Sequence, residues 1–444
     1  MRPLKTPPQA FDPASIAKVM GIFGRPETVE YLAKANKEYY HWEELRRRPP
    51  PAGLTAEEGW TAVKLSRSAR RLIPLLDVQG RPFSFWLPPA AYHIMHRADR
   101  QGGGVLAAKE GQQELFTEMR DRVLRDSLME EAIATSQIEG AVTTRRVAKE
   151  MLRSGRKPKN KSEQMIVNGY STITLIRDRA RQPLSMDLLH EIQASMTHDT
   201  LDDPRDAGRL RTSADDIHVV DVRDGQIVFT PPPASQLQAR LQRLIDFANS
   251  PCDESDFIHP LIRAAILHFW LAYEHPYVDG NGRTARALFY WSMLKAGYWL
   301  FEFLTISRVI LSAPMKYYRA FLHAESDEND LTYFLMFQFE VTGRALNELH
   351  DRLDEMQKQQ SRIRSLRLTK ELNSRQIALV DHALRHPAQI YTVESHQRSH
   401  NVSNETARHD LLKLTAQGLL AETGTGRPRR FMAATDLRKM LKQP

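Results

Sequence analysis

One stretch decides both the fold and the chemistry expected of this chain: His275-Pro276-Tyr277-Val278-Asp279-Gly280-Asn281-Gly282-Arg283-Thr284-Ala285-Arg286. The apolar run from Leu261 to Trp270 before it predicts a buried helix, and a second helix is predicted from Thr284 onward. Two glycines and an asparagine lie between the two helices and predict a loop. We therefore expect a helix–loop–helix corner in which the loop carries the polar residues.

The loop contains the residue types that bind a chain of phosphates. Backbone N–H groups at a helix N-terminus attract anions, and Gly280 and Gly282 let an anion approach the backbone closely. Arg283 and Arg286 are three residues apart, so one face of the helix can present both guanidinium groups. Two guanidinium groups beside an anion site suit a polyphosphate better than a single phosphate.

Two further residues supply chemistry. Asp279 offers a hard oxygen ligand for Mg²⁺, and His275 is the one group in the stretch that accepts a proton near neutral pH. The stretch thus predicts a nucleoside triphosphate site with a general base. The alternative is a structural corner, in which the glycines serve the turn and the arginines are surface charges.

The stretch resembles the Fic motif, His-Pro-Phe-x-Asp/Glu-Gly-Asn-Gly-Arg-x-x-Arg, with Tyr277 in place of the usual phenylalanine. The resemblance extends from about Asp126 to Leu353 and includes the segment Gly208-Arg209-Leu210-Arg211. Most members of the family transfer AMP from ATP to a protein hydroxyl. The resemblance therefore implies a protein adenylyltransferase that uses ATP as its substrate, Mg²⁺ as its cofactor and a target protein as its acceptor.

The resemblance also implies a role for each residue of the motif. His275 would be the general base for a Ser, Thr or Tyr hydroxyl, and Asp279 would hold Mg²⁺ on the α- and β-phosphates. The ATP phosphates would bind to Gly280, Asn281, Gly282, Arg283 and Arg286. The Doc-like phosphotransferase branch carries lysine at the position of Gly282, so the glycine favours adenylylation.

A second motif, Thr135-Ser136-Gln137-Ile138-Glu139-Gly140, follows a helix-like stretch and resembles the inhibitory pattern Ser/Thr-x-x-x-Glu-Gly/Asn of the same family. We expect Glu139, with Thr135 and Gly140, to pair with Arg286 and so to occupy the arginine meant for the γ-phosphate. By itself the pattern could equally be a solvated helix end. In some relatives this glutamate supports removal of AMP, so AMP removal and transfer of another nucleotide stay open as alternatives.

Two β-hairpins are predicted. Short apolar runs on either side of Asp224-Gly225 predict one from Ile217 to Phe229, and an alternating pattern predicts the other from Arg71 to Leu87. The resemblance implies that the first is a flap that docks an extended target segment by strand addition. Its expected contact residues are Ile217, Val219 and Val228. A plain surface hairpin is the alternative.

The C-terminal part carries the charge of the chain. From Ser361 to Pro444 there are 15 basic and 7 acidic residues, which accounts for the whole formal net charge of +8. Helices are predicted at Ser374–Arg385, Val393–His400 and Asn404–Gln417, followed by two short strands, which is the order of a winged helix-turn-helix domain. The expected DNA contacts are Arg408, Lys413, Arg427, Arg429 and Arg430.

DNA binding has alternatives of its own. The winged helix could serve dimerisation or hold a protein target. If it binds DNA, the chain could be a DNA-binding regulator that uses the Fic core as a nucleotide sensor. The oligomeric state also stays open, with a homodimer as one option.

The expected fold is mainly α, with a Fic helical core, a β-hairpin flap and a C-terminal winged helix. Its parts are an N-terminal helical arm with a Pro-rich linker (residues 1–52, including one helix from Pro26 to Leu45), an N-terminal Fic region (53–125), a catalytic core (126–355), a linker helix (356–370) and the winged-helix domain (371–444). This division agrees with a chain of 444 residues, which suits about two to four domains.

Several features indicate a cytoplasmic protein without a membrane span. The chain opens without a secretory signal, and its single cysteine, Cys252, fits a reducing compartment. The most apolar stretch, Ala287 to Leu304, contains two charged residues and is expected to be core. His190 and His268 are expected to be structural, and the histidine spacing fits no zinc finger.

Overall fold

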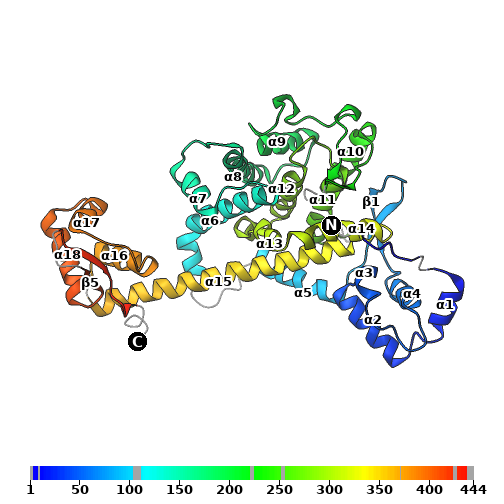
Figure 1. The fold of residues 1–444 in the computed structure, drawn as a ribbon, viewed down its shortest axis with the longest axis horizontal. Helices are drawn as coiled ribbons and strands as arrows, with labels where there is room; N and C mark the ends of the chain where they lie inside the picture. The colour runs from blue at the N-terminus through cyan, green and yellow to red at the C-terminus, as the bar shows by residue number, and fades with distance from the viewer. Residues whose placement is uncertain are drawn as a thin grey trace. The chain divides into compact units, whose positions relative to one another are not determined.

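The computed structural model describes residues 4–8, 11–103, 112–220, 225–251, 256–370, 372–423 and 428–437. These residues are mostly helical, as predicted. They form two compact units, one of residues 1–108 and 117–349 and the other of residues 109–116 and 350–444. The long helix α15 (Thr332–Lys370) runs through the boundary near residue 350 (Figure 1). The linker predicted at 356–370 is therefore part of a continuous helix.

The core of the first unit is built on α11 (Pro260–Glu274) and α12 (Asn281–Lys295), which pack against each other along their length. Almost every residue of both helices is buried, including polar and charged residues in the first two turns of α12. The helices around them are α6 (Gln112–Ile138), α7 (Arg145–Ser154), α8 (Lys161–Arg179), α9 (Met186–Thr197), α10 (Leu237–Asn249), α13 (Ile306–Ser312) and α14 (Pro314–Ser326) (Figure 1).

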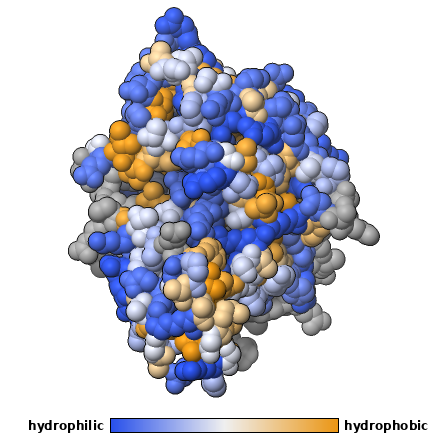
Figure 2. Space-filling model, turned by 90° about the vertical axis from the view of Figure 1, so that its right-hand side faces the viewer, coloured by the Kyte–Doolittle hydropathy of each residue, from blue (hydrophilic) through white to orange (hydrophobic). Residues whose placement is uncertain are grey.

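The stretch from Ala287 to Leu304 is part of this core, as predicted. It forms the end of α12 and a 3₁₀ turn at Trp299–Phe303, and most of its apolar side chains are buried. Among the described residues, no helix combines the length and the apolar character that a membrane crossing requires. On the face drawn in Figure 2, hydrophobic side chains form separate patches among hydrophilic ones.

The N-terminal arm is a small helical layer. It consists of α1 (Pro13–Met20), α2 (Pro26–Glu38), α3 (Trp42–Leu45) and α4 (Ala56–Ser66), and α5 (Pro89–Ala98) follows it. One hydrophobic cluster extends from Val19 in α1 to Val63 in α4. The boundary expected at residue 52 therefore does not separate two cores, because α4 completes the cluster that the earlier helices begin.

The single helix predicted from Pro26 to Leu45 is wrong. The chain breaks at Tyr39, whose backbone is left-handed with φ of 49°. Its hydroxyl donates to the buried carboxylate of Asp330, 2.7 Å away. Helical spacing continues across the break, so the pattern of apolar residues did not reveal it.

All strands lie in three antiparallel hairpins among the described residues. They are β1 (Arg71–Leu76) with β2 (Pro82–Phe85), β3 (Val219–Val220) with β4 (Ile227–Phe229), and β5 (Leu420–Thr423) with β6 (Arg430–Ala433). Both hairpins predicted in the first unit are thus present. Ile217 precedes β3 rather than belonging to it, and Asp224 of the predicted turn lies outside the described residues.

The second unit contains α16 (Ser374–Arg385), α17 (Val393–His400), α18 (Asn404–Ala416) and the β5–β6 hairpin, in the predicted order. Leu411 and Leu414 of α18 are buried in its hydrophobic cluster. The buried carboxylate of Asp410 joins the helices. It accepts hydrogen bonds from Asn373 Nδ2, Arg375 Nε and Gln376 Nε2, all at 2.9 Å, and lies 3.3 Å from His396 Nε2.

A buried ion pair attaches the N-terminal arm to the core. Lys64 Nζ of α4 lies 2.6 Å from Asp327 Oδ1 at the end of α14, and both side chains are 1% exposed. The Tyr333 hydroxyl donates to the other carboxylate oxygen of Asp327 at 2.8 Å. Burial of both charges makes each of them dependent on the other.

We expect Lys64→Met to lower the free energy of unfolding by about 3 to 5 kcal/mol, because it leaves the Asp327 carboxylate buried without its cation. The matched control is Lys18→Met. Lys18 pairs with Glu58 at 2.7 Å but is half-exposed, so its loss should cost about 1 kcal/mol or less. Urea unfolding followed by tryptophan fluorescence measures both changes. Equal losses in the two variants would contradict the buried attachment.

Candidate active site

The loop between α11 and α12 has an unusual backbone at both ends. His275 ends α11 in the left-handed conformation, with φ of 46° and ψ of 55°. Gly280 precedes α12 with φ of 82°, and a Cβ there would lie 2.6 Å from Thr197 Cγ2. A side chain at Gly280 would therefore be both strained and crowded. At Gly282, in the first turn of α12, an added Cβ would overlap Oε1 of Glu139.

Asn281 holds the loop together. Its Oδ1 accepts the backbone N–H of Tyr277 at 2.9 Å, and its Nδ2 donates to the Tyr277 carbonyl at 2.7 Å. Both polar atoms of its side chain are thus used in holding the loop. The buried Tyr277 hydroxyl hydrogen-bonds with His190 Nδ1 at 3.2 Å, so His190 has the structural contact that the sequence predicted.

The Thr135–Gly140 motif reaches Arg286 through Glu139, 147 residues earlier in the sequence. Arg286 Nη2 donates to Glu139 Oε1 at 2.8 Å and to the Thr135 carbonyl at 3.1 Å, and Arg286 Nε donates to Thr135 Oγ1 at 2.8 Å. Burial opposes the charge of Arg286, but the Glu139 carboxylate and the Tyr317 hydroxyl outweigh it and raise the pKa of the guanidinium. Arg286 therefore stays a cation and retains an anionic partner.

Arg283 and Asp279 form a second ion pair, between the first turn of α12 and the loop that precedes it. Arg283 is 1% exposed, its Nη1 donates to the Met196 carbonyl at 3.1 Å, and its Nε has no hydrogen-bond partner in the described structure. Its Nη2 lies 3.2 Å from Asp279 Oδ2. Asp279 is half-exposed, and its Oδ1 accepts the Gly280 N–H at 2.6 Å. Asp279 can thus reach a ligand in solvent, whereas Arg283 faces it from inside the protein.

His275 carries a neutral imidazole ring whose Nε2 can accept a proton. Its Nδ1 lies 3.3 Å from the Ala272 carbonyl, which can only accept, so Nδ1 carries the proton and Nε2 holds the lone pair. Burial lowers the pKa of His275 to about 4, although the Ala272 carbonyl and Glu139 partly oppose that effect. The imidazole is therefore neutral at physiological pH and able to take a proton through Nε2.

Three other expected residues, Ile217, Val219 and Val228, lie on or next to the β3–β4 hairpin and not in the loop between α11 and α12. Of the flap residues, Val219 and Val228 are half-buried, as is Ile217, whereas their neighbours Val220 and Ile227 are about half exposed. Because β3 pairs only with β4 among the described residues, each strand of the flap has one unpaired edge. Strand addition uses backbone groups, so these edges matter more than which side chain is exposed.

His268 is structural, as expected. Its Nε2 lies 2.9 Å from the Tyr317 hydroxyl and its Nδ1 lies 2.7 Å from Gln338 Nε2. Burial lowers its pKa well below the ordinary value. Because Tyr317 also lies beside Arg286, this buried chain of hydrogen bonds ends next to the arginine.

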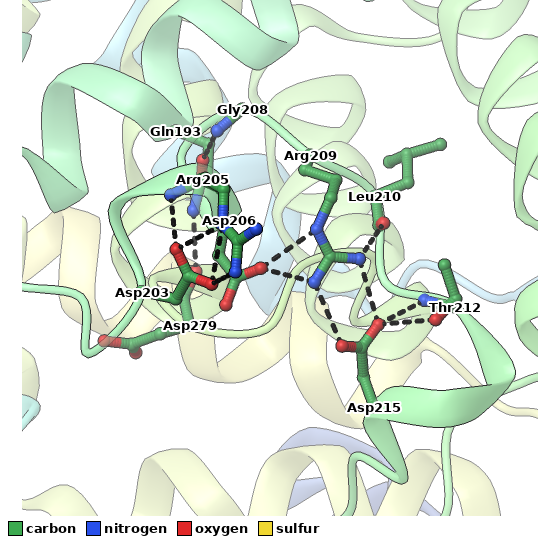
Figure 3. Close-up of polar contacts among 10 residues, drawn as sticks. All are labelled: Gln193, Asp203, Arg205, Asp206, Gly208, Arg209, Leu210, Thr212, Asp215 and Asp279. Atoms are coloured by element: carbon green, nitrogen blue, oxygen red, sulfur yellow. Dashed lines mark hydrogen bonds and ion pairs between the residues drawn. The ribbon is translucent and has the colours of Figure 1, made fainter.

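Sequence reasoning assigned no role to two residues that hold the loop. Gln193 of α9 is fully buried, its Nε2 donates to the Asp279 carbonyl at 3.0 Å, and its Oε1 accepts the Gly208 N–H at 2.5 Å (Figure 3). Arg211 donates to the loop from the other side, through its backbone and its guanidinium. The resemblance to the family includes the segment Gly208–Arg211, which contains Arg211 and the glycine that Gln193 contacts. This segment is therefore the part of the sequence that could have indicated both contacts.

No metal centre is built from protein side chains alone in the described part of the chain. No group of three or more His, Cys, Asp or Glu residues there is arranged to hold a metal ion. A cation beside Asp279 would therefore need oxygen ligands from phosphate and water. This donor set is the one that Mg²⁺ prefers in nucleotide sites.

Comparison with known proteins places a family domain over this site. Residues 183–293 match the Fic/DOC family. Protein adenylyltransferase fic-1 of Caenorhabditis elegans is 40% identical over 97 residues, which is 22% of this chain and 17% of that protein. Protein adenylyltransferase Fic of Drosophila melanogaster is 34% identical over 119 residues, 26% of this chain and 22% of that protein. The matches thus span about a fifth of these curated relatives.

The fold also matches a solved structure. A Fic family protein from Desulfovibrio desulfuricans aligns with a TM-score of 0.51 at 19% identity, covering 79% of this chain and 97% of that one. At this identity the likeness concerns the fold alone. It extends well beyond the residues that match the family.

We expect the ring protons of His275 to titrate with a midpoint near pH 4 in an NMR titration, because burial disfavours the charged imidazole. His275→Gln identifies the signal by its absence. Glu139→Gly should lower the midpoint further, since the carboxylate favours the protonated ring. A midpoint near the ordinary histidine value would show that the ring is solvated rather than buried.

Proposed function

We propose, from the Fic/DOC family domain that this chain carries, that the protein is a Mg²⁺-dependent protein adenylyltransferase that holds itself inactive through Glu139. It would transfer AMP from ATP to a Ser, Thr or Tyr hydroxyl of a target protein. One observation carries the proposal: the Glu139 carboxylate lies against Gly282 and Arg286 at the N-terminus of α12, where the first-turn N–H groups attract an anion.

The reaction follows from the position of His275. The acceptor hydroxyl gives its proton to His275 Nε2 as its oxygen attacks the α-phosphorus of ATP. The bond between the α-phosphorus and the bridging oxygen breaks, and pyrophosphate leaves with the electron pair. A neutral imidazole with a free Nε2 supports this role, because the base must be unprotonated before the attack.

The phosphates would replace Glu139 in this space. Arg286 Nη1 lies 3.3 Å from the Cβ position of Gly282, so it faces the same space as the glycine. A γ-phosphate there would take over the charge-assisted contact that Glu139 now makes, and Arg283 would lie beside the β- and γ-phosphates. Catalysis would then depend on positioning and charge stabilisation, as in other phosphoryl-type transfers.

Asp279 fits the expected Mg²⁺. Its carboxylate is half-exposed at the mouth of the site, next to the buried cation Arg283, so one oxygen ligand from the protein is within reach of the phosphate chain. When bound, Mg²⁺ would neutralise charge on the phosphates and orient them. The carboxylate would have to exchange its contact with Arg283 for the metal, which the exposure of Asp279 allows.

Glu139 would inhibit the enzyme by occupying the place beside Arg286 that the γ-phosphate needs. While Glu139 holds Arg286, ATP can enter only with its γ-phosphate displaced, and the α-phosphorus is then out of line with the acceptor hydroxyl. The contact is strong because Arg286 is buried, and it is breakable because Glu139 is about one-third exposed. The contact between Glu139 and Arg286 can therefore be broken, which supports reversible inhibition rather than permanent loss of activity.

We expect Glu139→Gly to raise the transfer of α-³²P-labelled AMP to protein by roughly 100-fold, because it frees one preorganised cation for the phosphates. Labelling should vanish in Glu139→Gly with His275→Ala. The matched control is Gln137→Gly, two residues earlier in the last turn of α6, whose side chain bonds the Thr143 carbonyl instead of Arg286. The assay uses purified protein with Mg²⁺, alone and with cell lysate.

The same assay separates the alternatives. Equal labelling in wild type, Gln137→Gly and Glu139→Gly would overturn inhibition by Glu139. ATP binding without pyrophosphate release in every variant would favour a nucleotide sensor. Loss of label from a modified target on adding wild-type protein would favour AMP removal, and labelling with another nucleotide would redefine the substrate.

We also propose that the C-terminal unit is a winged helix that binds DNA. Arg408 on α18 and Arg430 on β6 are exposed, which supports contact with phosphates. The other expected contacts are less favourable: Lys413 is half-buried, and Arg429 lies 3.3 Å from Glu422. Arg427 lies outside the described residues. With one cysteine in the chain, we further propose a cytoplasmic location.

We expect Arg408→Ala and Arg430→Ala each to weaken binding to a mixed-sequence duplex and to lower the slope of log K against log salt by about 1. Arg205→Ala, which removes an equally exposed arginine from the first unit, should leave the slope unchanged. Fluorescence anisotropy at several salt concentrations measures the slope. Absence of binding at low salt would indicate a protein-binding role instead.

A further inference from the structure

We propose that Arg211 is the positioning residue of His275 and that it couples this base to the β3–β4 flap. Arg211 touches neither the phosphates nor the reacting atoms. It acts through the backbone that carries the base and through the root of the flap. The inference rests on the proposed function and adds to it the residue that sets the distance between base and acceptor.

The contacts of Arg211 are concentrated on three consecutive carbonyls. Its Nη2 donates to the Glu274 carbonyl at 3.2 Å, its Nε donates to the His275 carbonyl at 2.7 Å, and its backbone N–H donates to the Pro276 carbonyl at 2.8 Å. One residue, 64 positions earlier in the chain, thus holds each peptide unit around the base.

These peptide units need holding because His275 is strained. A residue with a Cβ rarely adopts φ of 46° and ψ of 55°, and such a backbone persists only where its surroundings enforce it. The N–H of His275 is fixed by the Leu271 carbonyl at 3.0 Å, as the end of α11. On the C-terminal side the contacts with Arg211 hold the backbone from which the imidazole projects, and the Ala272 carbonyl holds the ring itself at Nδ1.

The same guanidinium also holds the flap. Arg211 Nη2 donates to the Pro232 carbonyl at 2.5 Å, three residues after β4 ends at Phe229. Arg211 itself lies eight residues before β3 begins at Val219. The segment that leads into the flap therefore contains Arg211, and the segment that leads out of it is hydrogen-bonded to Arg211. An acceptor segment that pairs with the flap would be placed relative to His275 by this one side chain.

The choice of residue supports a positioning role. Arg211 is 7% exposed, and its hydrogen-bond partners are backbone carbonyls rather than a carboxylate, so burial lowers its pKa. A buried cation without an ion pair is costly for stability. Only a planar guanidinium offers several donors in fixed directions, and a lysine ammonium at this site would serve fewer carbonyls.

Arg209 provides a matched control on the same segment. It is held between Asp206 and Asp215, and it donates to the Leu210 carbonyl at 3.0 Å (Figure 3). It makes no contact with residues 274–276 among its hydrogen bonds. A lysine there disturbs the same loop and removes the same guanidinium geometry without touching the base.

The first test compares Arg211→Lys and Arg209→Lys in the Glu139→Gly protein. At saturating MgATP, single-turnover AMP transfer should fall about 10- to 100-fold in Arg211→Lys, because the base and acceptor are misaligned. ATP affinity by calorimetry should stay within about threefold, since the phosphate contacts remain. Arg209→Lys should change transfer by less than about threefold. Guanidinium ion should restore part of the activity of Arg211→Ala, and none in His275→Ala.

The second test does not need transfer. The NMR titration of His275 should move up from about pH 4 in Arg211→Lys, because the released ring becomes solvated, and should stay in place in Arg209→Lys. The charged groups that act on the ring are Glu139, Arg211 and Asp279. For this titration the two lysine variants are made in the protein that retains Glu139, so both carboxylates are unchanged.

The outcomes separate the two proposals. Equal rate losses in the two lysine variants, parallel loss of ATP affinity in Arg211→Lys, or an unmoved His275 titration would each overturn the positioning role. Absence of labelling in Glu139→Gly itself would overturn the adenylyltransferase, while a moved titration would still establish that Arg211 sets the environment of His275.

Discussion

The arrangement of the candidate site depends on one buried cation, Arg286. Arg286 lies inside the helical core with 2% of its side chain exposed, and a guanidinium in that position needs an anion beside it. Glu139 supplies the anion from the end of α6, and Thr135 supplies two more acceptors. Under the proposed function a phosphate would replace Glu139 as this anion, so the charge of Arg286 would account both for substrate binding and for inhibition.

The loop around this cation is held from several directions. Asn281 closes it on itself, Gln193 holds the Asp279 carbonyl, and Arg211 holds the carbonyls at the base. Each contact removes freedom from a backbone that contains a strained histidine. Positioning of this kind is what a transfer reaction without a covalent intermediate requires, since its rate depends on the alignment of an acceptor, a base and a phosphorus.

Much of the architecture was predictable from local pattern. The helices of the second unit agree with their predicted bounds to within a residue, because each begins at a side-chain cap: Asn373, Thr392 and Ser403. The N-terminal arm was harder. At the break, Tyr39 is hydrogen-bonded to Asp330, 291 residues away. The spacing of apolar residues in the arm contains no information about so distant a partner.

By itself, the sequence determined which residue types the candidate site contains. Residue types and their spacing within one loop and one helix start are local properties, so the histidine, the glycines and the two arginines could be singled out without coordinates. Tertiary structure alone decided how these residues are used. It placed the Asn281 side chain in hydrogen bonds within the loop, lowered the pKa of His275 by burial, and brought Arg211 to the carbonyls of residues 274–276. The pKa of His275 and the contacts of Asn281 and Arg211 depend on burial and on segments that are distant in the sequence. Neither can be predicted from a local sequence pattern.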